Sequence, residues 1–157
     1  MSEKSISVRR VLDSEWEIYK QLRLKSLKSN PEAFGAKFDE AVLRPDTEWQ
    51  KQTQNFATSK EAVNFIALYN ENPVGLVSSY ISDKAEMFQM WVDSDVRGIG
   101  IGKQLVLNLK TWLKDIGETT LYATVYKDNT PALKLYQNLG FIEIGTSGRE
   151  IHLSCKL

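Results

Sequence analysis

The sequence contains only one cysteine and one histidine among 157 residues, and both scarcities restrict its chemistry. One cysteine cannot form a disulfide within the chain. With only one histidine as well, a Cys- or His-rich metal site is not expected. No run of about 18 apolar residues occurs, and the N-terminus lacks the apolar core of a secretory signal. We therefore expect no bound metal, no membrane insertion and a cytoplasmic location.

An excess of charge of one sign is also missing. The 20 Lys and Arg residues balance the 20 Asp and Glu residues, and no long run of one sign occurs. This balance disfavours nucleic acid or an anionic membrane as a partner. Hydrophobic residues make up 42% and charged residues 25% of the chain, as in ordinary globular proteins. The length predicts one domain over residues 1–157.

Alternating and helical hydrophobic patterns follow one another along the chain. They predict a mixed α/β sheet in the order β-α-α-β-β-β-α-β-α-β-β, with a helix start at the capping box Ser14-Glu15-Trp16-Glu17. Residues 31–44 fit neither pattern clearly. Strands are expected at 6–12, 63–69, 74–81, 86–92, 119–126, 141–144 and 150–156, and helices at 14–28, 45–56, 100–116 and 130–139.

A glycine-rich segment, Val96-Arg97-Gly98-Ile99-Gly100-Ile101-Gly102-Lys103, is the most informative part of the chain. It follows the apolar strand end Met90-Trp91-Val92 and opens an amphipathic helix. A strand, a tight turn and a helix in this order leave backbone N–H groups at the positive end of the helix dipole, where they can bind a phosphate or pyrophosphate. Glycine allows the backbone to approach such an anion closely. The alternative is a turn that binds nothing.

Residue identities separate this segment from two other phosphate-binding motifs. A P-loop requires Gly where Arg97 stands, and Ser or Thr where Gln104 stands. A dinucleotide-binding fingerprint requires a third Gly where the chain has Lys103 or Leu105. The pattern that fits is [Q/R]-x-x-G-x-[G/A], in which the three defined positions are Arg97, Gly100 and Gly102.

A second motif, Asn129 to Phe141, reads N-x-x-A-x-x-L-Y-x-x-x-G-F and follows the glycine segment by one helix and one strand. The two motifs, in this order and spacing, together with the element order of the whole chain, resemble the GNAT family of N-acetyltransferases. The resemblance implies the GNAT fold and acetyl-CoA as co-substrate, with no metal. It also implies transfer of the acetyl group to an amine by direct attack.

The resemblance assigns roles to particular residues. The backbone of Met90, Trp91 and Val92 would pair with the pantetheine arm and polarise the acetyl carbonyl, and the phenol of Tyr136 would protonate the leaving thiolate. Asn129 would cap its helix and also reach the cofactor. The pyrophosphate would lie against Arg97, Gly98, Ile99, Gly100, Ile101, Gly102 and Lys103.

Structural roles remain open for several of these residues. Asn129 can be only a helix cap, and Tyr136 can be only a core tyrosine. The attacking amine must be neutral, so the reaction needs a base. Glu86 stands where some family members carry a glutamate base, but it can also be a solvent-facing strand residue. His152 is interpreted as a structural histidine, and Cys155 as a small buried apolar residue.

The acceptor is the least defined part of the prediction. The resemblance implies a primary amine of a small molecule or a peptide, and it leaves a homodimer open. Glu32, Asp39 and Glu40 lie in the region expected to border the acceptor and could attract a cationic amine. The alternative function is a non-catalytic acyl-CoA-binding or regulatory module on the same fold.

Overall fold

The computed structural model of the chain describes residues 5–29 and 38–157. These residues form one seven-stranded sheet in the order β1-β2-β3-β4-β5-β7-β6, in which only the β4–β5 pair is parallel. The strands are β1 (Ile6–Arg10), β2 (Ala62–Tyr69), β3 (Asn72–Ile81), β4 (Ala85–Val92), β5 (Thr120–Tyr126), β6 (Ile142–Ser147) and β7 (Glu150–Lys156). The mixed α/β sheet predicted from the sequence is confirmed.

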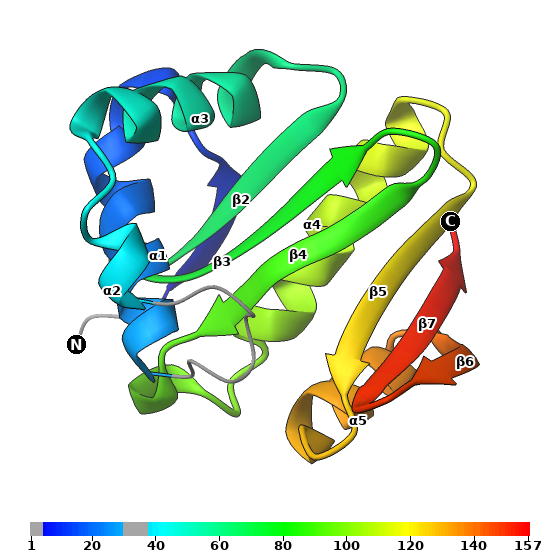
Figure 1. Cartoon of the computed structure of the whole chain (residues 1–157). Helices are drawn as coiled ribbons and strands as arrows, with labels where there is room; N and C mark the ends of the chain where they lie inside the picture. The colour runs from blue at the N-terminus through cyan, green and yellow to red at the C-terminus, as the bar shows by residue number, and fades with distance from the viewer. Residues whose placement is uncertain (1–4, 30–37) are drawn as a thin grey trace.

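Helices pack on both faces of this sheet (Figure 1). On one face α1, α2 and α3 gather over β1, β2 and β3, and on the other face α4 lies behind the central strands. A short α5 lies beside the end of β5 and the start of β7. The helices are α1 (Trp16–Ser29), α2 (Phe38–Ala41), α3 (Asp46–Thr58), α4 (Ile101–Asp115) and α5 (Thr130–Asn138). Among the described residues, no helix is both long and apolar enough to cross a membrane.

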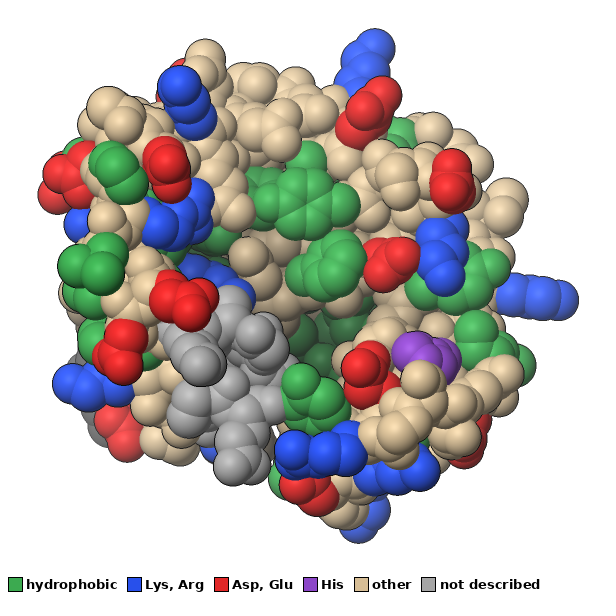
Figure 2. All heavy atoms as spheres, viewed as in Figure 1, with side chains coloured by type: hydrophobic (Ala, Val, Ile, Leu, Met, Phe, Trp, Pro, Cys, Tyr) green, Lys and Arg blue, Asp and Glu red, His purple; other side chains and the backbone are tan. Residues whose placement is uncertain are grey.

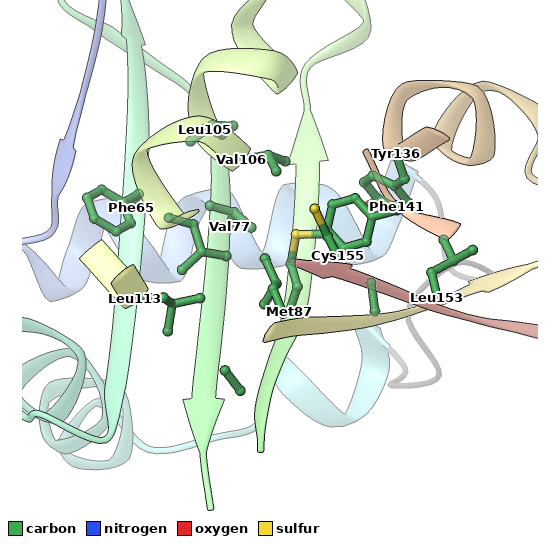
Figure 3. Close-up of a cluster of buried hydrophobic side chains, with 14 of the residues drawn as sticks. Phe65, Val77, Met87, Leu105, Val106, Leu113, Tyr136, Phe141, Leu153 and Cys155 are labelled. Atoms are coloured by element: carbon green, nitrogen blue, oxygen red, sulfur yellow. The ribbon is translucent and has the colours of Figure 1, made fainter. Parts of the chain in front are cut away.

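Two hydrophobic clusters hold these layers together. The larger cluster lies under α4 and α5 and includes Leu105, Leu113 and Leu153, all fully buried (Figure 3). The smaller cluster lies under α1 and α3 and includes Trp49 and Phe56. A buried leucine contributes about 1.5–3 kcal/mol relative to an exposed one, so both clusters stabilise the sheet that carries the site.

The two central strands separate early. Hydrogen-bonded pairing of β4 with β5 is limited to Ala85↔Leu121 and Glu86↔Tyr122, although both strands continue beyond these residues. Figure 1 shows β4 and β5 diverging from their common start. The backbone groups of β4 after Glu86 therefore have no β5 partner, and this side of the strand is available to a ligand.

Local details differ from the sequence prediction. A 3-10 helix, Asp13–Glu15, precedes α1, and Glu15 rather than Glu17 accepts the hydrogen bond from a backbone N–H, that of Leu12 (2.8 Å). The predicted box at Ser14–Glu17 is therefore displaced. Residues 38–41 of the ambiguous stretch form α2, whereas residues 30–37 lie outside the described chain. β6 runs beyond its predicted end to Ser147, because pairing with β7 continues to that residue.

Candidate acetyl-CoA site

A large open cavity of about 1170 Å³ lies where β4 and β5 separate. The same face of the molecule is hollowed in Figure 2, with apolar side chains gathered beside the hollow. Residues of β4, β5, α4 and α5 line the cavity, together with the turn before α4. The fold thus brings the two sequence motifs, more than 25 positions apart, to one site.

Nearly all the predicted site residues contribute to this cavity. Ile99 is the exception, since it does not line the cavity and its side chain is 46% exposed. The predicted residues that do line it are Glu86, Met90, Trp91, Val92, Arg97, Gly98, Gly100, Ile101, Gly102, Lys103, Asn129 and Tyr136.

The turn before α4 has the geometry of an anion-binding helix start. Gly100 precedes the helix at φ 91°, a left-handed conformation that a side chain would strain. The first helical hydrogen bond runs from Gln104 N–H to Gly100 C=O (3.0 Å), so the N–H groups of Ile101, Gly102 and Lys103 stand ahead of the helical ladder. These three donors at the positive end of the helix dipole suit a phosphate group.

The next glycine brings three elements close together. A Cβ on Gly102 would lie 3.0 Å from Met90 Cε on β4 and 3.1 Å from Leu135 Cδ2 on α5. Without a side chain at this position, the start of α4 approaches both neighbours. The end of the cavity formed by the start of α4 is therefore packed directly against the strand and the helix that line its other walls.

Side chains fix this turn to the rest of the fold. Asp93, which is 9% exposed, accepts hydrogen bonds from Lys25 Nζ on α1 (2.5 Å) and from Asp95 N–H (3.1 Å). The hydrogen bond from Lys25 is the main reason that the pKa of Asp93 lies below its usual value. Arg97 Nε donates to the Val92 carbonyl (2.9 Å). The Arg97 side chain thus holds the end of β4, a contact that the sequence motif did not predict.

The second motif forms α5 and its two ends. Asn129 Oδ1 accepts a hydrogen bond from Ala132 N–H (3.3 Å), which confirms the helix cap. At the other end, Phe141 N–H donates to Tyr136 C=O and Gly140 N–H to Gln137 C=O, the paired hydrogen bonds of a Schellman ending. Both ends of α5 are fixed, so the side chains that it presents to the cavity hold defined positions.

Tyr136 is both a core residue and a cavity residue. It is 6% exposed and packs at a tilt on Phe141, with 5.6 Å between ring centroids (Figure 3). Burial raises the pKa of its phenol above the ordinary value. No residue in the described ranges forms a hydrogen bond with its hydroxyl. The phenol therefore stays protonated at physiological pH, and its O–H can donate to a ligand in the cavity.

Glu86 lies where the two central strands part. It lines the large cavity and also a smaller depression that contains His152 and Thr124. Its carboxylate is 3.9 Å from Lys84 Nζ, a solvent-exposed pair of little energetic weight. His152 is only partly buried, and its Nδ1 lies 3.1 Å from Thr124 Oγ1. The histidine therefore lies on the same open face as Glu86 rather than in the core, unlike Cys155, which is buried as predicted.

The polar residues of the cavity that received no binding role from the sequence include Arg23 and Gln89. Arg23 of α1 is buried, and burial lowers the pKa of its guanidinium. Gln89 lies in β4 at φ 58°, where the pairing of β3 with β4 shifts register between Leu76 and Ser78. A polar residue in the otherwise apolar second half of β4 was the available signal for Gln89. The acidic residues predicted near the acceptor, Asp39 and Glu40, do not line the cavity, and Glu32 lies outside the described residues.

No group of three or more His, Cys, Asp or Glu side chains within residues 5–29 and 38–157 could hold a metal ion. The cavity instead offers the donors that a coenzyme A thioester needs. Backbone N–H groups at the start of α4, a protonated phenol and a strand with backbone groups unpaired on the β5 side all line it. The residues present fit coenzyme A by their donor set.

Comparison with known proteins agrees with this geometry. The family model described as the acetyltransferase (GNAT) family matches residues 16–141. The ribosomal protein bS18-alanine N-acetyltransferase of Escherichia coli (strain K12) is 29% identical over 96 residues, which are 60% of this chain and 65% of that protein. The match thus spans less than two thirds of that relative.

Solved structures share the fold over nearly the whole chain. A GNAT-family acetyltransferase from Streptococcus pneumoniae superposes with a TM-score of 0.85 at 18% identity, covering 98% of this chain and 99% of that chain. The PaiA N-acetyltransferase from Thermoplasma acidophilum, solved in complex with coenzyme A, has a TM-score of 0.71 at 17% identity, with 98% and 99% covered. The chain belongs to the GNAT acetyltransferase family.

Proposed function

We propose that this protein is an N-acetyltransferase that moves the acetyl group of acetyl-CoA to a primary amine of a small molecule or a peptide. The single observation that carries the proposal is the cavity between β4 and β5, which joins the helix-start donors to Tyr136. Family membership supports the same reaction class. The alternative, a non-catalytic acyl-CoA-binding module, is less favoured because the Tyr136 hydroxyl faces no structural partner among the described residues.

Backbone groups make most of the contacts that we propose for acetyl-CoA. The N–H groups of Ile101, Gly102 and Lys103 receive the pyrophosphate, with Arg97, Gly98, Gly100 and the Asn129 side chain beside them. The pantetheine arm runs along β4, where Met90, Trp91 and Val92 lie beyond the last pairing with β5. A backbone N–H of this segment then polarises the thioester carbonyl, as an oxyanion-binding donor does.

Bond formation needs a neutral amine and a stabilised leaving group. The amine nitrogen bonds to the thioester carbon, the C–S bond breaks, and the amine proton passes to a base while the thiolate gains a proton. Tyr136 donates its proton or a hydrogen bond to the sulfur, since its phenol is protonated at neutral pH. Glu86, at the mouth of the strand separation, accepts the amine proton directly or through water.

The acceptor is proposed more broadly than the donor. The bS18-alanine N-acetyltransferase acts, by its name, on the alanine of a ribosomal protein, so peptide α-amines belong among the acceptors to be tested here. A panel of primary amines and short peptides, assayed with acetyl-CoA for release of free thiol, tests the proposal. At least one acceptor should release thiol well above the rate without amine. Thiol release that no amine in the panel increases, together with tight coenzyme A binding, would favour the binding-module alternative.

A further inference from the structure

The side chain of Gln89 is held in place by buried polar groups. Its Oε1 accepts hydrogen bonds from Tyr19 OH on α1 (3.0 Å) and from Ser78 Oγ on β3 (2.8 Å). Ser78 in turn accepts from Asn64 Nδ2 on β2 (2.9 Å). Tyr19, Ser78 and Asn64 are fully buried. The side chain is thus anchored from three elements of the fold, while Gln89 itself lines the large cavity.

The chain of hydrogen bonds also fixes which way the Gln89 amide faces. Asn64 Nδ2 donates to the Val77 carbonyl (3.3 Å), which can only accept, so the Asn64 amide is oriented with its nitrogen toward Ser78. The Ser78 hydroxyl receives that bond and has its own hydrogen left to donate. In the structure it donates this hydrogen to Gln89 Oε1, which also accepts from Tyr19, so the amide oxygen of Gln89 faces these two hydroxyls.

In this orientation the amide nitrogen of Gln89, Nε2, remains available to a ligand in the cavity. No hydrogen bond within residues 5–29 and 38–157 uses Nε2. The backbone of Gln89 has φ 58°, an uncommon conformation for a residue with a side chain. The hydrogen bonds of the side chain help to hold the backbone in this conformation. Two N–H donors are thus presented from a fixed position in a cavity that Arg23 also lines.

The position of these donors relates to the reacting atoms. Gln89 immediately precedes Met90 and Trp91, whose backbone is proposed to hold the thioester, and one strand residue spans about 3.3 Å. An acceptor oxygen three bonds from the attacking nitrogen would lie within reach of Nε2. That spacing describes an α-amino group, whose neighbouring carbon carries a carbonyl or a carboxylate.

We propose that Gln89 is a specificity-determining residue that selects acceptors whose amine is adjacent to a carbonyl or carboxylate oxygen, through a hydrogen bond from Nε2. This inference rests on the proposed function. Simple alkylamines lack the oxygen, so they leave both donors unpaired in the occupied cavity. A site built to hydrogen-bond an oxygen discriminates against an analogue that lacks it, because its own polar groups then remain unsatisfied.

Three matched acceptors test whether the oxygen belongs to a carbonyl or to a carboxylate: phenylalaninamide, phenylalanine and phenethylamine. They share the aromatic side chain and differ in carrying a carbonyl, a carboxylate or neither. Since the amines also differ in intrinsic reactivity, the informative quantity is the change in kcat/KM from wild type to variant, compared among the acceptors. The Kd of acetyl-CoA, measured by calorimetry, reports whether each variant is folded and binds the donor.

Gln89→Glu keeps an oxygen for Tyr19 and Ser78 and replaces the two N–H donors with a second oxygen. We expect kcat/KM to fall about tenfold or more for phenylalaninamide and further for phenylalanine, whose carboxylate is repelled, with no fall for phenethylamine. Gln89→Gly removes the side chain at a position whose φ favours glycine, so it provides a second folded variant with the same expected loss for phenylalaninamide.

Equal changes for all three acceptors, or no change for phenylalaninamide and phenylalanine, would overturn the role of Gln89. A fall confined to phenylalaninamide in Gln89→Gly, with phenylalanine unaffected, would assign the site to peptides rather than free amino acids. Failure of the proposed function is distinguishable, because the wild-type protein would then transfer acetyl to none of the three acceptors.

Discussion

Replacing Tyr136 with Phe removes one hydroxyl from the candidate site and tests its role in the reaction. The ring is 6% exposed and packs on Phe141, and Phe keeps both features. The hydroxyl forms no hydrogen bond with the described residues, so folding loses none. The free energy of unfolding should therefore change by less than about 0.5 kcal/mol, as for a substitution that removes no contact. For a chain of this length that is a shift in Tm of about 1–2 °C.

Turnover should change much more. A hydrogen bond to a developing thiolate is worth about 1.5–3 kcal/mol, because the acceptor is charged. At about 1.4 kcal/mol per factor of ten, kcat should fall roughly 10- to 100-fold. The Kd of acetyl-CoA should hardly move, since the thiolate exists only as the bond breaks. Steady-state thiol release, calorimetry with acetyl-CoA and a melting curve measure the three quantities.

Tyr69→Phe is a matched control, because Tyr69 lies on β2 and does not line the cavity. That variant should keep the wild-type kcat. The account of Tyr136 is refuted if its Phe variant loses acetyl-CoA affinity and Tm along with kcat, since the residue would then act through packing. An unchanged kcat would refute it equally.

Two further substitutions test the supports of the glycine turn. Gly100→Gln places a side chain at φ 91°, so the turn should distort and acetyl-CoA affinity should fall about tenfold by calorimetry; wild-type affinity would remove the turn from the site. Asp93→Asn removes the charge that Lys25 binds, and it should lower Tm at pH 7 by about 3–6 °C, for about 1–2 kcal/mol. The pKa of Asp93 is depressed, so its stabilisation is present above about pH 4, the value for an unfolded aspartate, and is lost as pH falls through the folded value. The Tm difference between wild type and Asp93→Asn should therefore disappear toward pH 2; a constant difference would contradict the ion pair.

The sequence predicted the parts of the fold that depend on local patterns. Helical spacing in α4 and α5, the Schellman ending at Gly140 and the glycine turn were all evident, because each is encoded within a few neighbouring residues. The capping box at Ser14 was displaced since Glu15, and not Glu17, accepts from a backbone N–H, and propensity alone cannot separate the two alternatives.

Long-range features of the site could not be predicted in this way. The contact of Lys25 with Asp93 joins residues 68 positions apart, and the network around Gln89 joins α1, β2 and β3. The left-handed conformation of Gln89 results from a register shift between two strands, which leaves no local signature in the sequence. The side-chain bond of Arg97 to Val92 likewise depends on how the turn folds back on β4.

The central claim, that acetyl-CoA binds between β4 and β5, is tested most directly by amide hydrogen exchange with and without the ligand. The account predicts slower exchange at Ile101, Gly102 and Lys103, whose N–H groups precede the helical ladder, and at the β4 residues beyond Glu86. Exchange at the β1–β2 pairing should change far less. Unchanged exchange at the glycine turn and β4 with saturating acetyl-CoA, or protection confined to another region, would contradict the account.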